Sequence, residues 1–176
     1  METITVNTIR EFLYMQNQHI SHIAVGHTFF RPYEKSNQQI AKYVEIAHKQ
    51  CRFFRNRFNQ FLYGAKAHRK PLLYQPLLIT TIEGTNDIND RSQTIHFNFA
   101  LGNIPDELTT EELRQVFTDC WIRAGLNDKA LWLREAGSLN DNQGWLKYIT
   151  KEAETGNLET WDFENTQIPY LALTTD

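Results

Sequence analysis

The sequence predicts an α+β protein: one central antiparallel β-sheet with helices packed on one face, in the order β-α-β-β-α-β-α. Segments in which apolar and polar residues alternate predict strands, and they are interleaved with segments whose apolar residues recur every three or four positions, as in helices. Two consecutive strand segments with a polar, glycine-containing connection predict a hairpin, and therefore an antiparallel sheet. With 176 residues, 41% hydrophobic and 22% charged, the chain has the size and composition of one globular domain.

The first half of the chain predicts a strand followed by a long helix. Residues 21–30 alternate as a strand, and Pro32 ends it. Ser36 is a suitable N-cap for a helix that runs to about Leu62, and Gly64 ends that helix. Its apolar stripe is Ile40, Tyr43, Val44, Ala47, Cys51, Phe54, Phe58 and Phe61. A short amphipathic stretch (Ile9, Phe12, Leu13, Met15) precedes these elements, and a basic loop, KAHRKP at 66–71, follows them.

The second half predicts the hairpin and two further helices. Thr109 and Glu112 form a capping-box pattern, which places a helix start there. The expected elements are strands at 76–83 and 94–101, a helix from the capping box to Ala124, a strand at 130–136, a loop at 137–144 and a short helix at 145–153 capped by Asn142 or a near neighbour. The polar side of the hairpin is expected to face outward, because the apolar side of each strand meets the helices.

We expect one domain over residues 1–176, with a core at about 21–153 and an acidic C-terminal tail at 154–176 that Trp161, Phe163 and Tyr170 pack down. The length leaves no room for a helicase domain. No run of 18 apolar residues and no signal-peptide pattern occur, which predicts a cytoplasmic protein without membrane contact. Cys51 and Cys120 are then expected as buried, reduced thiols.

Charge is distributed unevenly along the chain. Residues 1–75 hold eleven Lys and Arg against four acidic residues, whereas the remainder holds seven basic and 17 acidic residues. This polarity is typical of a protein with one phosphate-binding face, although an unevenly charged, solvated surface would give the same pattern. The candidate DNA-binding residues are Arg31, Arg52, Arg55, Arg57, Lys66, Arg69 and Lys70.

Two groups of residues could carry chemistry. If the hairpin pairs its strands in the expected register, Glu83, His96 and Asn98 meet on one sheet face, where they could ligate Mg²⁺ or Mn²⁺. In the last helix, Tyr148 and Lys151 share a face, so a tyrosine hydroxyl that can attack a phosphodiester lies beside a cation. Taken alone, His96 is also compatible with a surface histidine, and the Tyr148–Lys151 pair with a half-buried tyrosine beside a solvated lysine.

Four segments in order resemble the HUH endonuclease superfamily, in particular the initiators of rolling-circle replication of plasmids, phages and transposons. HTFFRP at 27–32 resembles the first-strand motif. FRNRFNQFLYG at 54–64 with LLITTIEG at 77–84 resembles the helix and the strand ending in Glu-Gly. TIHFNFALGNIP at 94–105 resembles the His-hydrophobic-His motif, and GWLKYITKE at 144–152 the nucleophile motif. The resemblance covers about residues 21–153.

The resemblance implies a ferredoxin-like or RRM-like HUH fold and a role for each motif residue. Tyr148 would be the nucleophile, Lys151 would assist at the scissile phosphate, and Glu83 and His96 would bind a divalent metal. Two departures stand out: Asn98 replaces the second histidine, and Glu152 stands where double-tyrosine members have another tyrosine. An amide oxygen can still ligate a hard cation.

The implied activity is site-specific nicking and joining of single-stranded DNA through a 5′-phosphotyrosine, at a single strand or hairpin of a replication origin and with a host helicase as a further partner. The main alternative is a non-catalytic module that binds single-stranded nucleic acid on the same sheet. RNA-binding sheets of this kind stack bases on aromatic residues of the open face. Here Phe97 and Phe99 are expected to point toward the helices, which disfavours that reading. A weaker alternative is an interaction protein that uses the acidic half.

Overall fold

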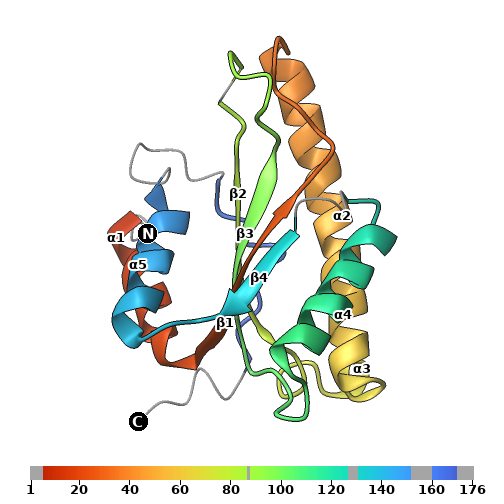
Figure 1. Ribbon diagram of the computed structural model, residues 1–176, viewed down its shortest axis with the longest axis vertical. Helices are drawn as coiled ribbons and strands as arrows, with labels where there is room; N and C mark the ends of the chain where they lie inside the picture. The colour runs from red at the N-terminus through yellow and green to blue at the C-terminus, as the bar shows by residue number, and fades with distance from the viewer. Residues whose placement is uncertain (1–5, 87, 127–130, 152–159, 170–176) are drawn as a thin grey trace, which may run out of the picture.

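The computed structural model describes residues 6–86, 88–126, 131–151 and 160–169. Within them the chain is α+β, with a four-stranded antiparallel sheet and five helices (Figure 1). The strands are β1 (Ile20–His27), β2 (Leu77–Glu83), β3 (His96–Gly102) and β4 (Leu131–Glu135). The helices are α1 (Val6–Met15), α2 (Asn37–Tyr63), α3 (Lys66–Arg69), α4 (Thr110–Arg123) and α5 (Leu139–Ile149). None of these helices is long and apolar enough to cross a membrane.

The strand order in the sheet is β2-β3-β1-β4, so the predicted hairpin forms one side and the first strand lies in the interior. The hairpin has the register that alternation predicted: Glu83 pairs with His96 and Thr81 pairs with Asn98. Gly84 ends β2 with a φ of 81°, where L-residues with a side chain are strained, and an added Cβ would lie 2.5 Å from the Thr94 carbonyl oxygen.

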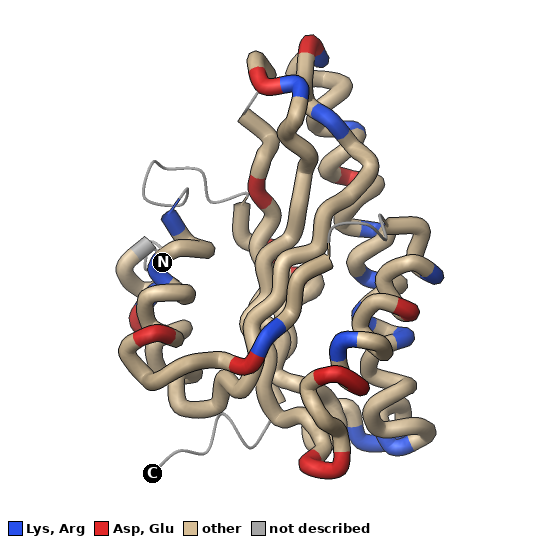
Figure 2. Tube along the Cα trace, in the orientation of Figure 1, with Lys and Arg blue, Asp and Glu red and all other residues tan. Residues whose placement is uncertain are grey.

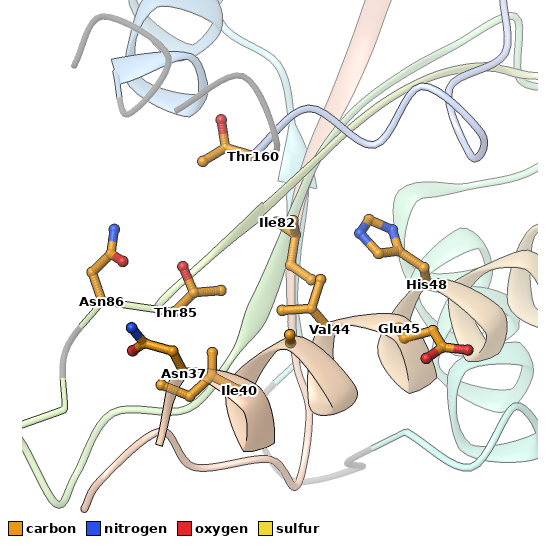
Figure 3. A pocket seen from close by; sticks show the side chains of 10 residues that line it. Asn37, Ile40, Val44, Glu45, His48, Ile82, Thr85, Asn86 and Thr160 are labelled. Atoms are coloured by element: carbon orange, nitrogen blue, oxygen red, sulfur yellow. The ribbon is translucent and has the colours of Figure 1, made fainter. Parts of the chain in front are cut away.

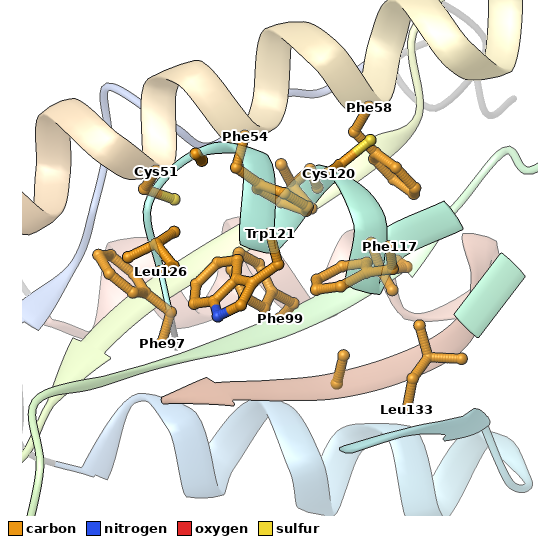
Figure 4. Packing of buried hydrophobic residues seen from close by; sticks show 14 of the residues in the cluster. Cys51, Phe54, Phe58, Phe97, Phe99, Phe117, Cys120, Trp121, Leu126 and Leu133 are labelled. Atoms are coloured by element: carbon orange, nitrogen blue, oxygen red, sulfur yellow. The ribbon is translucent and has the colours of Figure 1, made fainter. Parts of the chain in front are cut away.

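One face of the sheet packs against α2 and α4 and forms the larger core. Phe97 and Phe99 of β3 point into this layer, as the alternation predicted, and meet Phe54 of α2 and Trp121 of α4 (Figure 4). All four rings are buried, and burial of each aromatic side chain stabilises the fold by about 2–3 kcal/mol. This layer fixes the positions of the strands that carry the candidate site on their opposite side.

The prediction that the helices occupy one face is wrong, because α1 and α5 cover part of the other face (Figure 1). Ile9 and Leu13 of α1 and Leu146 and Ile149 of α5 pack on apolar side chains of that face. These are Ile23, Leu77, Ile79 and Ala100, which make the second side of the sheet apolar at one end. Such a surface requires its own cover, so the sheet is a middle layer rather than an outer one.

The helix starts follow their capping residues. Ser36 with Gln39 and Thr109 with Glu112 form capping boxes, as predicted. The start predicted for the last helix is wrong: α5 begins at Leu139, and the predicted loop at 137–144 is mostly helical. The physical reason is a third capping box. The Ser138 hydroxyl accepts a hydrogen bond from the backbone N–H of Asp141, and the Asp141 carboxylate accepts one from the backbone N–H of Ser138.

The segment after α5 was predicted to be an acidic tail, but its described part, residues 160–169, lies along the free edge of β2. Isolated bridges join Leu78 to Gln167 and Thr81 to Trp161. Trp161 is buried, whereas Phe163, which was also predicted to pack down, is 58% exposed. Tyr170 lies outside the described residues.

Both cysteines are buried and unpaired by a disulfide, in agreement with the sequence. Burial raises the pKa of Cys51 well above its usual value and that of Cys120 to about 11. At pH 8 only about one thiol in a thousand would be ionised at a pKa of 11, and thiolate is the reactive form. We therefore predict that a colorimetric thiol reagent reacts with neither residue in the folded protein and with both in denaturant. Rapid reaction without denaturant would contradict the packing of α2 on α4.

Candidate catalytic site

Three titratable side chains form a row across the face of the sheet opposite α2 and α4. Glu83 pairs with His96 in the β2–β3 ladder, and His96 pairs with His27 in the β3–β1 ladder. Directly paired residues project from the same side of a sheet, about 5 Å apart. The imidazole rings of His27 and His96 are stacked with 5.0 Å between their centroids. The row therefore places the Glu83 carboxylate beside His96, and His96 beside His27, at the end of the hairpin.

Glu83 is 2% exposed, so the expectation that this polar face is open to solvent is wrong at this position. Burial raises the pKa of Glu83, but hydrogen bonds and attraction from His96 and Lys151 outweigh it, so the pKa lies below the usual carboxyl value. Glu83 is thus an anion at neutral pH. Its Oε2 contacts Lys151, while its Oε1 is buried and has no hydrogen-bond partner among the residues that the structure describes. A buried carboxylate oxygen without a partner is costly unless another group satisfies it.

The proton of His96 can be assigned from its surroundings. Nδ1 lies 3.1 Å from the Thr94 carbonyl oxygen, which can only accept, so Nδ1 donates. With Nδ1 as a donor, Nε2 faces the Glu83 carboxylate, 3.7 Å from Oε2, and it can either donate to this anion or give its lone pair to an ion. Metal-ligating histidines typically hold one ring nitrogen on a carbonyl or carboxylate and offer the other to the ion.

Two further polar residues of this face, Asn98 and His27, are less available to bind an ion or a substrate. Asn98, one pair along β3, is 1% exposed, and its amide nitrogen lies 3.5 Å from the hydroxyl of Thr81. This contact directs the amide nitrogen to Thr81, so the amide oxygen is the group left for a cation. Burial lowers the pKa of His27, and His96 lowers it further, so this ring is neutral at pH 7. His27 also lies 2.7 Å from the Thr94 hydroxyl, through Nδ1.

Helix α5 brings the second predicted group to the same place. The ammonium of Lys151, just beyond the end of α5, lies 3.1 Å from Glu83 Oε2 and 3.9 Å from the ring centroid of Tyr148. Partial burial lowers the pKa of Lys151, but Glu83 outweighs it and raises the pKa overall, so the cation persists at neutral pH. Tyr148 is 47% exposed, which leaves its ring accessible to a large substrate.

The side chains at this site provide only some of the ligands that a divalent metal ion needs. Glu83, His96 and Asn98 supply a carboxylate, an imidazole and an amide oxygen, and the partnerless Oε1 of Glu83 is suited to an ion. Among the described residues, no three His, Cys, Asp or Glu side chains are grouped so that they could hold one. The third donor would be the neutral amide of Asn98, and an amide oxygen binds a transition metal more weakly than an imidazole does. Lys151 contacts the other Glu83 oxygen at 3.1 Å.

The predicted DNA-binding residues separate into three places. Arg31 lies in the loop after β1 and donates to the Arg91 carbonyl. Arg52 pairs with Glu164 and Arg55 donates to the Glu164 backbone, so these two anchor the segment at 160–169. Exposed cations also gather around the C-terminal end of α2 and α3, at the bottom of the molecule in Figures 1 and 2: Arg57, Lys66, Arg69 and Lys70.

A hollow of about 720 Å³ lies away from the row, between α2 and the end of β2 (Figure 3). It is lined by Ile82, which points to the opposite side of the sheet from Glu83, and by His48. His48 Nδ1 lies 2.9 Å from the buried carboxylate of Asp162. The carboxylate also holds Asn165, so this pair fastens the 160–169 segment to α2.

Sequence reasoning missed three residues of this face. His27 was read as a strand residue without a role, because the sequence does not reveal that β1 lies beside β3. Trp132 and Trp145 were not singled out, although Trp132 and Arg134 alternate with the buried Leu133 in β4. That alternation was a usable signal for an exposed tryptophan. Glu152, which was read as the mark of a single-tyrosine site, lies outside the described residues.

Comparison with models of protein families gave no match, and neither curated proteins nor solved structures gave one.

Proposed function

We propose that this protein nicks and rejoins single-stranded DNA through a covalent intermediate on Tyr148, as the HUH endonucleases do. The substrate would be a single-stranded or hairpin segment at a replication origin, such as that of a plasmid or phage, with a host helicase as a further partner. The fold supports this proposal to the level of a four-stranded antiparallel sheet that carries polar residues on one face and a helix across that face.

One observation carries the proposal: Lys151 contacts both the Tyr148 ring and the Glu83 carboxylate. An exposed tyrosine thus lies beside a cation, and that cation lies on a buried acid of the sheet. A phosphodiester carries one negative charge, and the Lys151 ammonium can neutralise it as the tyrosine oxygen approaches. The sequence had marked the two groups as separate motifs on a strand and a helix.

The proposed step is an in-line displacement at phosphorus. A bond forms between Tyr148 Oη and the phosphorus, the bond to the 3′ oxygen breaks, the tyrosine proton passes to solvent and the leaving oxygen becomes a 3′-hydroxyl. A divalent ion bound by Glu83, His96 and Asn98 would supply charge stabilisation at the phosphate. The 3′ end can prime synthesis, and attack of a 3′-hydroxyl on the phosphotyrosine restores the strand.

The direct test is to incubate the protein with labelled single-stranded origin DNA and Mn²⁺ and to look for a covalent adduct on a denaturing gel. An adduct that requires single-stranded DNA and carries label on the 5′-phosphate side supports the proposal. Binding without any adduct, over the candidate origins of the replicon, would instead favour the non-catalytic nucleic-acid-binding module.

A further prediction concerns the exposed basic group around α3. Helix α2 spans 27 residues, or about 40 Å, and ends at this group. We expect charge reversal of Lys66, Arg69 and Lys70 together to weaken binding of a long oligonucleotide and to lower its salt slope by about 2. A short oligonucleotide centred on the nick should bind unchanged, because it does not reach α3. Equal effects on both lengths, measured by fluorescence anisotropy against salt, would contradict this placement.

A further inference from the structure

A line of aromatic and cationic side chains extends from Tyr148 across the open end of the sheet. The Trp145 ring stacks on Tyr148 with 5.4 Å between centroids and an interplanar angle of 24°. Trp132 of β4 follows, with 6.1 Å between its centroid and that of Trp145. The Arg134 guanidinium lies over Trp132 at 5.3 Å, and Lys151 lies over Tyr148 at the other end. The line therefore has a cation at each end and three rings between them.

The position of these rings follows from the sheet. Trp132 pairs with Val25 in the β1–β4 ladder, and Val25 pairs with Asn98, so Trp132 shares a face with the candidate site. Strands are spaced about 4.8 Å apart, which places its backbone roughly 10 Å from that of Asn98. Trp145 is fixed by its indole nitrogen, which donates to the Phe99 carbonyl oxygen at 3.1 Å.

Exposure distinguishes the two outer rings of this line from ordinary core packing, whereas Trp145 between them is partly buried against the second core cluster. Trp132 is 43% exposed and Tyr148 is 47% exposed, although both are large rings that a core would cover. A hollow of about 370 Å³ borders Trp145, Tyr148 and Arg134. Rings with an open face and flanking cations are the elements with which proteins bind single strands, since bases stack on the rings and phosphates contact the cations.

Gly144 supplies an independent observation. It lies inside α5, one turn before Tyr148, and lines the same hollow. A glycine within a helix costs about 1 kcal/mol relative to alanine. Apart from its own helix backbone and chain neighbours, a Cβ at this position would meet no atom of the described residues within 4 Å, so packing against that part of the chain does not require the glycine. Close approach of a ligand to the helix backbone would account for it.

We propose that Trp132, Trp145 and Gly144 form a base-stacking subsite for the nucleotides that flank the scissile phosphate on one side. This inference rests on the proposed function, because Tyr148 then defines where the scissile phosphate lies. Arg134 contacts a phosphate farther along the strand. The subsite takes unpaired bases of any sequence, because every base has a face that can stack.

The test measures the affinity of single-stranded oligonucleotides by fluorescence anisotropy. Trp132→Ala is expected to weaken binding about tenfold, whereas Trp132→Phe keeps most of the affinity. Gly144→Leu fills the hollow and is expected to weaken binding about as much, while thermal unfolding shows an equal or more stable protein. Phe53→Ala is the matched control, because it removes an exposed ring (64% exposed) from α2 and should bind as the parent protein does.

Abasic substitutions along the oligonucleotide identify the stacked base. One position near the nick should weaken binding to the parent protein and have no further effect on Trp132→Ala, since the same contact is already lost. Unchanged affinity of Trp132→Ala together with additive abasic effects would overturn the subsite. The adduct assay distinguishes the two proposals. If the adduct forms but Trp132→Ala leaves the affinity unchanged, only the subsite is contradicted. If Trp132→Ala weakens binding but no adduct forms, only the catalytic proposal is contradicted.

Discussion

Replacing Tyr148 with phenylalanine is expected to abolish the covalent protein–DNA adduct, by at least about a thousandfold in rate, while DNA affinity changes less than twofold. The substitution removes only the attacking oxygen and keeps the ring that stacks on Trp145 and lies under Lys151. The measurement is a single-turnover time course of adduct formation on denaturing gels, with affinity determined in parallel.

Tyr74→Phe is the matched control for this experiment. Tyr74 lies near the basic end of the molecule, where its ring meets Tyr63 and Lys66, so its loss should leave adduct formation unchanged. An adduct that persists in Tyr148→Phe would transfer the nucleophile role to another tyrosine, with Tyr43, Tyr63 and Tyr74 the first to examine. Since Tyr43 packs on Phe30 and Tyr63 donates to the Asn103 carbonyl, both are engaged in the fold.

Loss of the proposed metal ligands is expected to have the second-largest effect. Glu83→Gln and His96→Ala are each expected to remove Mn²⁺ binding in calorimetric titrations and to slow adduct formation about 100-fold or more. Glu83→Gln keeps the shape of the buried side chain but removes the charge that both an ion and Lys151 require. His96→Ala removes the imidazole whose Nε2 lies 3.7 Å from Glu83 Oε2.

Two further variants sharpen this test. His68→Ala removes an exposed histidine from α3 and should change neither metal binding nor adduct formation. Asn98→His adds a second imidazole and should tighten Mn²⁺ more than Mg²⁺, because imidazole prefers transition metals. Normal nicking by His96→Ala, together with a parent protein that binds no metal, would make the row structural and would favour the non-catalytic binding module.

Local patterns predicted most of the fold. The register of the hairpin followed from alternation, since a shift of one residue would have exposed Phe97 and Phe99 and buried His96. The caps at Ser36 and Thr109 fixed two helix starts because capping is a local hydrogen-bond pattern. The start of α5 was misread because Gly144 and several Asn and Asp residues favour a loop, and tertiary packing of Leu146 and Ile149 overrides that preference.

The arrangement of layers could not be read from local patterns. Ile79 and Ala100 project to the same side of the sheet as Glu83 and Asn98, so this side is apolar at one end and polar at the other. Alternation alone identified the polar end of this face, but it did not predict that α1 and α5 cover the apolar end. For the same reason the sequence indicated Glu83, His96 and Asn98 but not their burial, and it did not indicate His27 or Trp132, which depend on strand order.

The segment at 160–169 covers the outer edge of the sheet, along β2. An uncovered outermost strand presents a row of free amide and carbonyl groups, on which another chain can assemble. Along β2 those groups are engaged: Leu78 and Gln167 exchange two backbone bonds, and the Asp162 amide donates to the Thr80 carbonyl. A shortened chain that ends after α5 would keep Tyr148 and Lys151 but leave this strand open. We expect such a protein to self-associate through β2 more readily than the whole chain does, because the segment at 160–169 no longer engages these groups.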